Sequence, residues 1–237
     1  MSPRIQNRAA LLADLPPADR ERRALALDAA DAALRAADPE PATAAVLARW
    51  RDEGWPPAPL QILAVGKAAA AMARACADLP HAGGFVLGDD AEGLQRLPAD
   101  HPLPHPESPR AAAALRAGLR LPTLVLLSGG GSAMLCDPAE GLDIDDLRHS
   151  HGVLLRSGLD VGAINALRAA LDGMKGGGLA WLLPPGSRAI VLSDVPGHGP
   201  EVVASGPLSP PRPLPPPPPG LRPRVVEHLR RWTPPPP

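Results

Sequence analysis

Short apolar runs bounded by proline or glycine predict the strands of a sheet. The clearest are LQILAV, which follows a cluster of three prolines, and TLVLLS, which Pro122 precedes. Runs of this length between turn residues are typical of buried strands. We expect four strands, at residues 60–65, 83–88, 123–128 and 187–193.

The segments around these runs carry apolar residues at helical spacing. In the first segment Leu27, Ala30 and Leu34 recur at helical intervals, Asp19 caps the start and Asp38-Pro39 ends the pattern. Helices are expected at residues 19–36, 42–51, 67–77, 108–118, 143–156, 160–172 and 175–183. Because strands alternate with helices, we expect an α/β fold, specifically a three-layer α/β/α Rossmann-like domain with a mainly parallel sheet.

The last part of the chain is rich in proline, including five consecutive prolines at 215–219. A proline run adopts polyproline II and cannot join a sheet. We therefore expect one domain over residues 1–208 and a proline-rich tail over 209–237, with one short helix at about 221–232.

The composition excludes several classes of function. The net charge of −1 gives no electrostatic footprint for nucleic acid or for an anionic membrane. Two cysteines, Cys76 and Cys136, are too few for a disulfide framework, which favours a reducing compartment. We find neither an apolar run long enough to span a membrane nor a signal-peptide apolar block, so a cytoplasmic location is expected.

Lysine is rare in this chain, since Lys67 and Lys175 are its two lysines among 24 basic residues. Lys67 follows the first predicted strand and Gly66, at the start of a predicted helix. A helix N-terminus disfavours a cation unless an anion is bound nearby, so Lys67 is a candidate for binding an anionic ligand. A solvated surface lysine is the alternative.

The third predicted strand leads into a glycine-rich loop. Its residues are Ser128, Gly129, Gly130, Gly131 and Ser132. Consecutive glycines leave backbone N–H groups free to converge on one anion, which is how proteins cradle phosphate. A plain turn is the alternative. The chain contains neither a Walker A motif nor, after the first strand, the glycine fingerprint of dinucleotide binding.

A third candidate segment combines polar residues with glycines. Asn165 and Arg168 are three residues apart and share a helix face. Lys175, Gly176 and Gly177 then offer a second anion-binding turn. A helix with an ordinary glycine C-cap is the alternative, although it leaves the lysine unexplained.

The fourth predicted strand ends in Ser193-Asp194, and Ser205-Gly206 follow further on. A carboxylate at the carboxyl end of a strand, opposite a phosphate loop, is a common Mg²⁺ ligand in phosphoryl transfer, which makes Asp194 the candidate metal ligand. A turn cap is the alternative for Asp194. His101 lies in DHPLPHPES, where we expect it to shape a loop near the site, and a structural zinc site is disfavoured because no matching partner set accompanies the histidines.

These motifs together resemble the class II glycerate 2-kinases, a family also named hydroxypyruvate reductases. The matching stretches occur in family order: VGKAAAAMA, DHPLPHPES, LLSGGGSAML, LLRSGLDVGAINALRAALDGMKGGGLA and VLSDVPGHGPEVVASGPLSP. The resemblance implies transfer of a phosphoryl group from ATP, with Mg²⁺, to the 2-hydroxyl of D-glycerate. It assigns catalytic roles to Lys67, Arg168 and Asp194. The nucleotide-binding candidates are Gly66, Ser128, Gly129, Gly130, Gly131, Ser132, Asn165, Lys175, Gly176, Gly177, Ser193, Ser205 and Gly206.

The sequence departs from the family pattern at Gly178, at His198-Gly199 and at Leu208. The resemblance also implies a second domain that completes the active site, and this chain ends at Pro237 without it. The first hypothesis is therefore a glycerate 2-kinase-like phosphotransferase, active alone or with a protein partner that supplies the second wall. The alternative is a weak or inactive nucleotide- or anion-binding protein, and NAD-dependent hydroxypyruvate reduction is a third.

Overall fold

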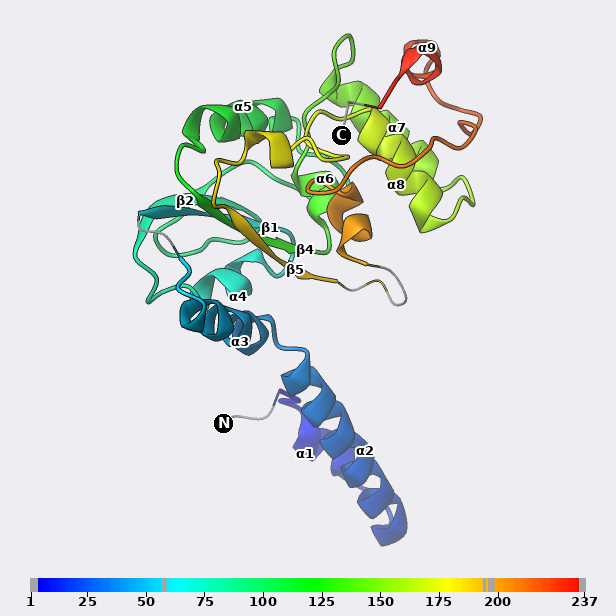
Figure 1. Cartoon of the computed structure of the whole chain (residues 1–237). Coiled ribbons are helices and arrows are strands. Elements are labelled where there is room, and N and C mark those ends of the chain that lie inside the picture. The colour runs from blue at the N-terminus through cyan, green and yellow to red at the C-terminus, as the bar shows by residue number, and fades with distance from the viewer. Residues whose placement is uncertain (1–3, 57–58, 194, 196–198, 235–237) are drawn as a thin grey trace.

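A single sheet of five parallel strands forms the centre of the protein in a computed structural model that describes residues 4–56, 59–193, 195 and 199–234 (Figure 1). The order of the strands across the sheet is β3-β2-β1-β4-β5. Their bounds are β1 Leu60–Val65, β2 His81–Leu87, β3 Gln95–Arg96, β4 Thr123–Ser128 and β5 Arg188–Leu192. The expected α/β class is confirmed, and every strand pair is parallel.

Helices cover both faces of the sheet (Figure 1). On one face α3 (Pro39–Asp52) and α4 (Ala69–Arg74) contribute Leu47 and Met72 to a cluster with strand residues such as Leu124. On the other face α5 (Ser108–Gly118) contributes Leu115 to a cluster that includes Val125. The strands therefore have buried side chains in both directions, which explains their continuous apolar runs.

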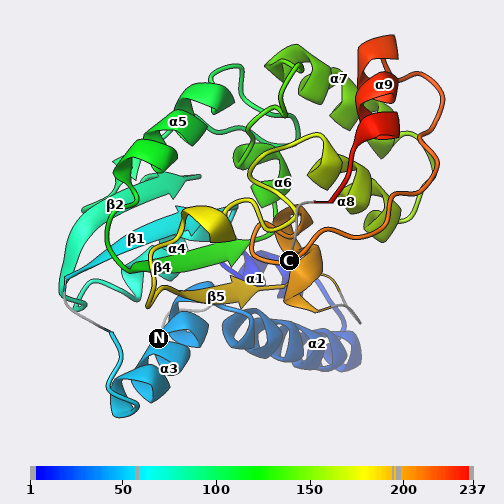
Figure 2. The same ribbon diagram turned by 45° about the horizontal axis from the view of Figure 1, so that its top comes forward.

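A second helical layer lies beside the sheet. The helices α7 (Ile144–Leu155), α8 (Val161–Ala170) and α9 (Pro223–Arg231) pack around a separate apolar cluster that includes Leu154, Leu167 and Leu229 (Figure 2). The remaining helices are α1 Arg8–Leu12, α2 Pro17–Ala36, α6 Gly131–Met134, and two 3₁₀ helices, η1 Ala180–Leu182 and η2 Pro200–Ser205. None of the helices in the described part of the chain is both long and apolar enough to cross a membrane.

Helix α9 ties the proline-rich segment to the rest of the protein. Val225 and Leu229 are buried in the same cluster as Leu154 and Leu167. His228 also shares a hydrogen bond of 2.8 Å with the carbonyl of Ala170 on α8. The division into a domain over 1–208 and a tail over 209–237 stays a prediction, but the helix expected near 221–232 exists and is docked.

The expected helix at residues 175–183 is wrong. The chain turns repeatedly from Leu171 to Leu179, and only Ala180–Leu182 form a short 3₁₀ helix. Gly176 and Gly177 have φ of +54° and +88°, a region that glycine adopts at no steric cost and that no right-handed helix contains. The expected helix at 67–77 is shorter, and β3, α1 and α6 were not expected from the sequence.

Candidate functional site

Two of the three segments predicted to bind anions lie side by side at one edge of the sheet. Strands β1 and β4 are direct neighbours, so the turn after β1 with Gly66 and Lys67 meets the loop Ser128–Gly131 after β4. The other strands extend the sheet on either side of this pair, with β2 and β3 beyond β1 and β5 beyond β4. Parallel α/β sheets bind ligands at such a switch point, at the carboxyl ends of the strands.

Backbone hydrogen bonds lock the two loops together. The N–H of Lys67 donates to the carbonyl of Gly129 (2.9 Å), and the N–H of Ala68 donates to Oγ of Ser128 (3.1 Å). The Ser128 hydroxyl in turn donates to the carbonyl of Val65 (3.2 Å). Gly66, at φ +112°, allows this approach, because a Cβ there would lie 2.3 Å from Ser128 Oγ. The hydroxyl of Ser128 therefore braces the turn.

Gly130 lies under the side chain of Lys67. Gly130 has φ +91°, and a Cβ at this position would lie 3.0 Å from Cγ of Lys67 and 3.3 Å from Cδ2 of His101. The aliphatic part of Lys67 and the imidazole of His101 thus pass close to the bare backbone of the glycine loop. Next in the chain, Gly131 lies against Ala204, where a Cβ would be 2.6 Å from the alanine Cβ. Glycine is required at both positions for this packing.

The edge gathers positive charge. Arg168 on α8 is partly buried, and its Nε atom is buried without a hydrogen-bond partner. Burial lowers the pKa of Arg168. Burial also lowers the pKa of His101, and the charges of Lys67 and Arg168 lower it further. Lys67 and Arg168 are thus both close enough to influence His101, in an arrangement that an anion would stabilise.

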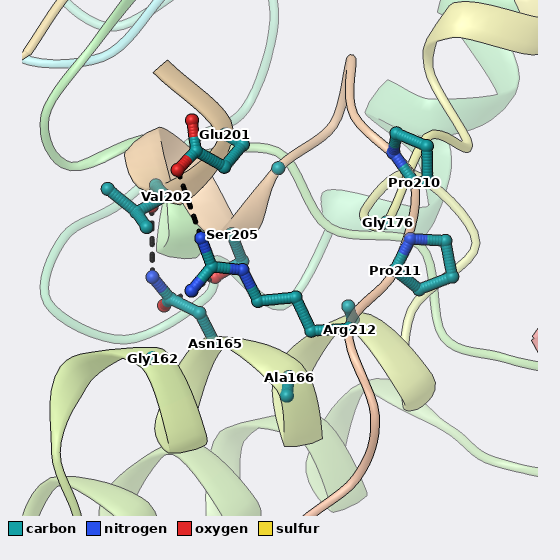
Figure 3. Close-up of a pocket in the computed structure, with 12 residues that line it drawn as sticks. Gly162, Asn165, Ala166, Gly176, Glu201, Val202, Ser205, Pro210, Pro211 and Arg212 are labelled. Carbon is teal, nitrogen blue, oxygen red and sulfur yellow. Dashed lines mark hydrogen bonds and ion pairs between the residues drawn. The ribbon is translucent and has the colours of Figure 1, made fainter. Parts of the chain in front are cut away.

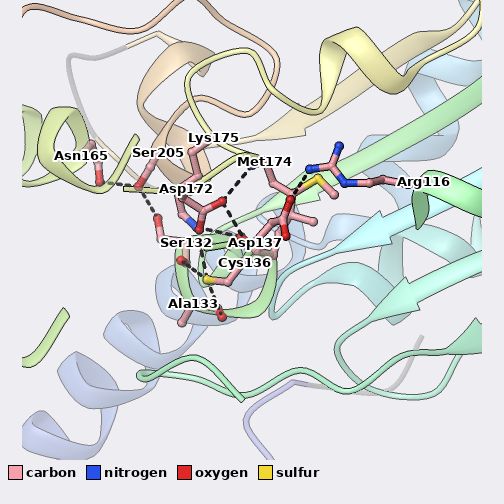
Figure 4. Close-up of polar contacts among 11 residues, drawn as sticks. Arg116, Ser132, Ala133, Cys136, Asp137, Asn165, Asp172, Met174, Lys175 and Ser205 are labelled. Atoms are coloured by element: carbon pink, nitrogen blue, oxygen red, sulfur yellow. Dashed lines mark hydrogen bonds and ion pairs between the residues drawn. The ribbon is translucent and has the colours of Figure 1, made fainter. Parts of the chain in front are cut away.

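A chain of hydrogen bonds links the glycine loop to α8 and η2 (Figure 4). The hydroxyls of Ser132 and Ser205 are 2.9 Å apart, Ser205 donates to Oδ1 of Asn165 (2.9 Å), and Asn165 Nδ2 donates to the carbonyl of Val202 (2.9 Å). Ala204 and Ser205 have φ of +54° and +63°. Left-handed conformations of residues other than glycine cost energy and concentrate at functional sites.

The cavity beside this chain is small. It has a volume of about 20 Å³, and Asn165, Ser205, Gly206 and Gly176 are among the residues that line it (Figure 3). Arg212 lies across it in an ion pair of 3.0 Å with Glu201. A cavity of this volume holds about one water molecule and is too small for a nucleotide.

Lys175 does not join Lys67 at the sheet edge. Its side chain is fully buried, and its ammonium group contacts Asp172, the carbonyl of Leu135 (2.8 Å) and Sγ of Cys136 (3.2 Å) (Figure 4). These three partners use all three ammonium protons. Burial alone would lower the pKa of Lys175, but the charges of Asp172 and Cys136 and their hydrogen bonds outweigh it and raise the pKa.

The predicted second anion-binding turn has no free backbone donors at its two glycines. The N–H of Gly176 donates to the carbonyl of Ser205 (3.3 Å), and the N–H of Gly177 donates to that of Gly206 (2.9 Å). The proline segment also covers the turn, because a Cβ at Gly176 would lie 3.0 Å from Pro211 Cβ. In this structure Lys175, Gly176 and Gly177 hold the fold together and are not positioned to bind an anion.

Asp194, the predicted catalytic residue and magnesium ligand, lies outside the described residues, and so does His198. Ser193 stands exposed after β5, where its hydroxyl accepts from the N–H of Val195 (3.3 Å). Within residues 4–56, 59–193, 195 and 199–234, no group of three or more His, Cys, Asp or Glu side chains could hold a metal ion.

His101 is the residue at this edge that the predicted set of site residues did not include. Its place in DHPLPHPES predicted that it shapes a loop near the site, but gave it no catalytic or binding role. Its proximity to Lys67 depends on the meeting of three separate loops, which residue spacing does not reveal. Asp172 and Cys136 were also missed as the partners of Lys175.

Fold and site together define an α/β domain with a glycine loop and basic side chains at the switch point of a parallel sheet. Residues 25–214 match the family described as Domain of unknown function (DUF4147), and the chain belongs to this family. It is homologous to the N-terminal part of glycerate 2-kinases, which also carry the name hydroxypyruvate reductase.

Two relatives illustrate the similarity. The chain is 34% identical over 157 residues to a glycerate 2-kinase from Pyrococcus horikoshii, covering 62% of this chain and 36% of the relative. It is 36% identical over 160 residues to a putative hydroxypyruvate reductase from Agrobacterium vitis, covering 62% of this chain and 42% of the relative. The chain therefore spans about two fifths of the length of these proteins.

Two crystal structures have the same fold. A Pyrococcus horikoshii protein superposes with a TM-score of 0.61 at 30% identity, over 73% of this chain and 45% of the other. Glycerate kinase from Thermotoga maritima superposes with a TM-score of 0.60 at 27% identity, over 74% and 48% of the two chains.

Proposed function

We propose that this chain carries the phosphoryl-binding half of a glycerate 2-kinase-type active site, which transfers the γ-phosphoryl group of ATP to the 2-hydroxyl of D-glycerate. The observation that carries the proposal is the position of Lys67 over the bare backbone of Gly130, at the carboxyl ends of β1 and β4. The glycerate 2-kinase relatives support the reaction and the substrate.

The residues at the edge fit the phosphate groups of a nucleotide. The Gly130 surface would be filled by any Cβ, and the buried Nε of Arg168 lacks a partner. ATP supplies the phosphoryl group, and Lys67, Arg168 and the N–H groups of the glycine loop would hold its charge. Phosphoryl transfer depends on such positioning and on charge stabilisation more than on covalent catalysis.

The same cations offer a place for the carboxylate of a small hydroxy acid. With two cations at this edge, one of Lys67 and Arg168 could pair with the carboxylate of the acid while the other faces the phosphoryl group. Holding the acid and the phosphoryl group at one edge would supply the proximity that the reaction needs. Mg²⁺ would be held by Asp194, which lies outside the described residues, and would neutralise part of the charge on the phosphates.

A second candidate is a half-site that binds nucleotide or phosphate but does not turn over alone. The observation that favours it is length, because the chain spans 36% and 42% of the two relatives. A protein partner would then supply the other wall of the site. Hydroxypyruvate reduction, the activity in the name of the Agrobacterium vitis relative, ranks third, since no dinucleotide fingerprint follows β1.

The decisive assay measures ATP-dependent formation of 2-phosphoglycerate from D-glycerate and Mg²⁺. Lys67→Ala should lower kcat/KM by about 100-fold or more, because it removes a charge that stabilises the transition state. Arg120→Ala is the matched control, since Arg120 is an exposed cation at the opposite ends of the strands. If no turnover is found, ATP binding that is saturable and is abolished by Lys67→Ala would support the half-site. ATP binding that Lys67→Ala leaves unaltered would reject both the kinase and the half-site.

A further inference from the structure

His101 lies at the phosphoryl-binding edge and has no role in the function proposed above. Its imidazole and the side chain of Lys67 both approach Gly130, where an added Cβ would be 3.3 Å from His101 Cδ2 and 3.0 Å from Lys67 Cγ. His101 is also exposed to solvent, so a substrate can reach its ring. The imidazole therefore faces the place where the phosphoryl group and its acceptor would meet.

The chemistry of the edge requires a proton acceptor. Transfer to an alcohol releases the hydroxyl proton, and kinases position a base for it. At neutral pH lysine and arginine have no free lone pair, so Lys67 and Arg168 cannot accept a proton, whereas a neutral imidazole can. Of these three groups, His101 alone has the chemistry of a base.

The surroundings of His101 keep its ring neutral. Among the described residues, the charged groups that act on it are Lys67, from the turn after β1, and Arg168, from α8, while the glycine loop after β4 carries no charge. Partial desolvation by the surrounding atoms lowers the pKa of His101 from its usual 6.5, although the residue is largely exposed, and these two cations lower it further. At physiological pH the imidazole is thus free to accept a proton.

We propose that His101 is the general base toward the acceptor hydroxyl. The inference deepens the proposed function and rests on it. As the hydroxyl oxygen forms its bond to phosphorus, the O–H bond breaks and the proton passes to a ring nitrogen of His101. The bond from phosphorus to the leaving oxygen breaks, and its electron pair stays on the β-phosphate of the ADP product.

The first test compares His101→Gln with His105→Gln, a matched control from the same proline-rich loop. His101→Gln should lower kcat by roughly 100-fold with KM changed by less than about threefold, because a base acts in the transition state. His105→Gln should leave both unchanged. In the unaltered chain kcat/KM should fall as the pH drops through the pKa of His101, below 6.5, and the variant should lose that dependence.

The second test does not require turnover and follows the His101 Cε1 resonance by NMR. Lys67→Ala should raise the pKa of His101, since it removes a positive neighbour. D-glycerate should shift the resonance saturably, and 3-hydroxypropionate, which lacks the 2-hydroxyl, should shift it at least about tenfold more weakly.

The outcomes separate the two proposals. If kcat of His101→Gln stays within threefold of the unaltered chain, or if its kcat/KM still falls at acid pH, His101 is not the general base, and the proposed kinase activity is unaffected. If the chain shows no turnover, the kinase fails for this chain alone. His101 is then judged by NMR, where a hydroxyl-dependent shift supports it and equal shifts with both acids, or none, overturn it.

Discussion

Lys175 and Asp172 form a buried ion pair, with 0% and 1% of their side chains exposed, across a turn and not along a helix. Asp172 also accepts hydrogen bonds from the N–H groups of Asp137 (3.2 Å) and Met174 (2.9 Å). The pair therefore ties the turn after α8 to the segment after α6. A lysine that the sequence presents as an anion-binding candidate is instead the centre of a structural cluster.

Removing the charge of Lys175 should destabilise the fold strongly. Lys175→Met should lower the free energy of unfolding by about 3–5 kcal/mol, because it leaves the carboxylate of Asp172 buried without a counter-ion. Arg110→Met is the control, since Arg110 also pairs with a residue three positions away, Glu107, but on the surface, where such a pair contributes less than about 1 kcal/mol. Urea unfolding measures both. Equal effects of the two substitutions would contradict the structural role of Lys175.

Gly130→Ala should weaken nucleotide binding through its contact with Lys67. Gly141→Ala is the matched control, because Gly141 has a similar φ of +81° but no atom within 4 Å of the added methyl, whereas at Gly130 (φ +91°) the methyl meets Lys67 and His101. Both variants should lose about 1–2 kcal/mol of stability from backbone strain. Calorimetric titration should show that the affinity for ATP falls roughly tenfold or more in Gly130→Ala alone, since the displaced side chain of Lys67 would no longer face the phosphates. Similar ATP affinities in the two variants would remove Gly130 from the site.

His151 should make the fold sensitive to acid. It is 2% exposed, and burial, with the charges of Arg168 and Lys175, lowers its pKa well below 6.5. The unfolded chain binds this proton near pH 6.5 and the folded chain does not, so stability is retained above that pH and lost below it, by up to about 1.4 kcal/mol per pH unit. The free energy of unfolding, measured by urea denaturation at several pH values between about 8 and 5, should therefore depend less on pH in His151→Gln than in the unaltered chain. Parallel curves for the two proteins would mean that His151 does not contribute.

The strands were predictable because their signal is local. The apolar runs predicted β1, β2, β4 and the edge strand β5, which belong to a sheet that helices cover on both faces. The strand β3 consists of Gln95 and Arg96, which are both exposed, so no apolar pattern predicts it. Its pairing with β2 comes from tertiary packing.

Those parts of the candidate site that lie directly after a strand were predictable from the sequence. The parallel sheet brings the loops after β1 and β4 to one edge, which is why Lys67 and the glycine loop were found together. The turn around Lys175 was misinterpreted as a helix, because its conformation depends on distant partners such as Leu135 and Ser205. Composition and spacing record none of those contacts.

Leu229 on α9 tests whether the proline-rich segment is part of the folded unit. The side chain is 6% exposed in the cluster that Leu154 and Leu167 also form, whereas Arg230 beside it has a side chain that is 72% exposed. Leu229→Ala should lower the free energy of unfolding by about 2–4 kcal/mol, since it opens a cavity in this cluster, and Arg230→Ala should change it by less than about 0.5 kcal/mol.

Chemical unfolding followed by both fluorescence and circular dichroism measures these values and shows whether the transition is single. One transition that moves as a whole in Leu229→Ala means that α9 unfolds with the sheet, because the stability of the unit then includes the docked helix. An unchanged main transition in Leu229→Ala would instead mean that α9 detaches independently, which would support the boundary expected near residue 208 and restrict the folded unit to the residues before it.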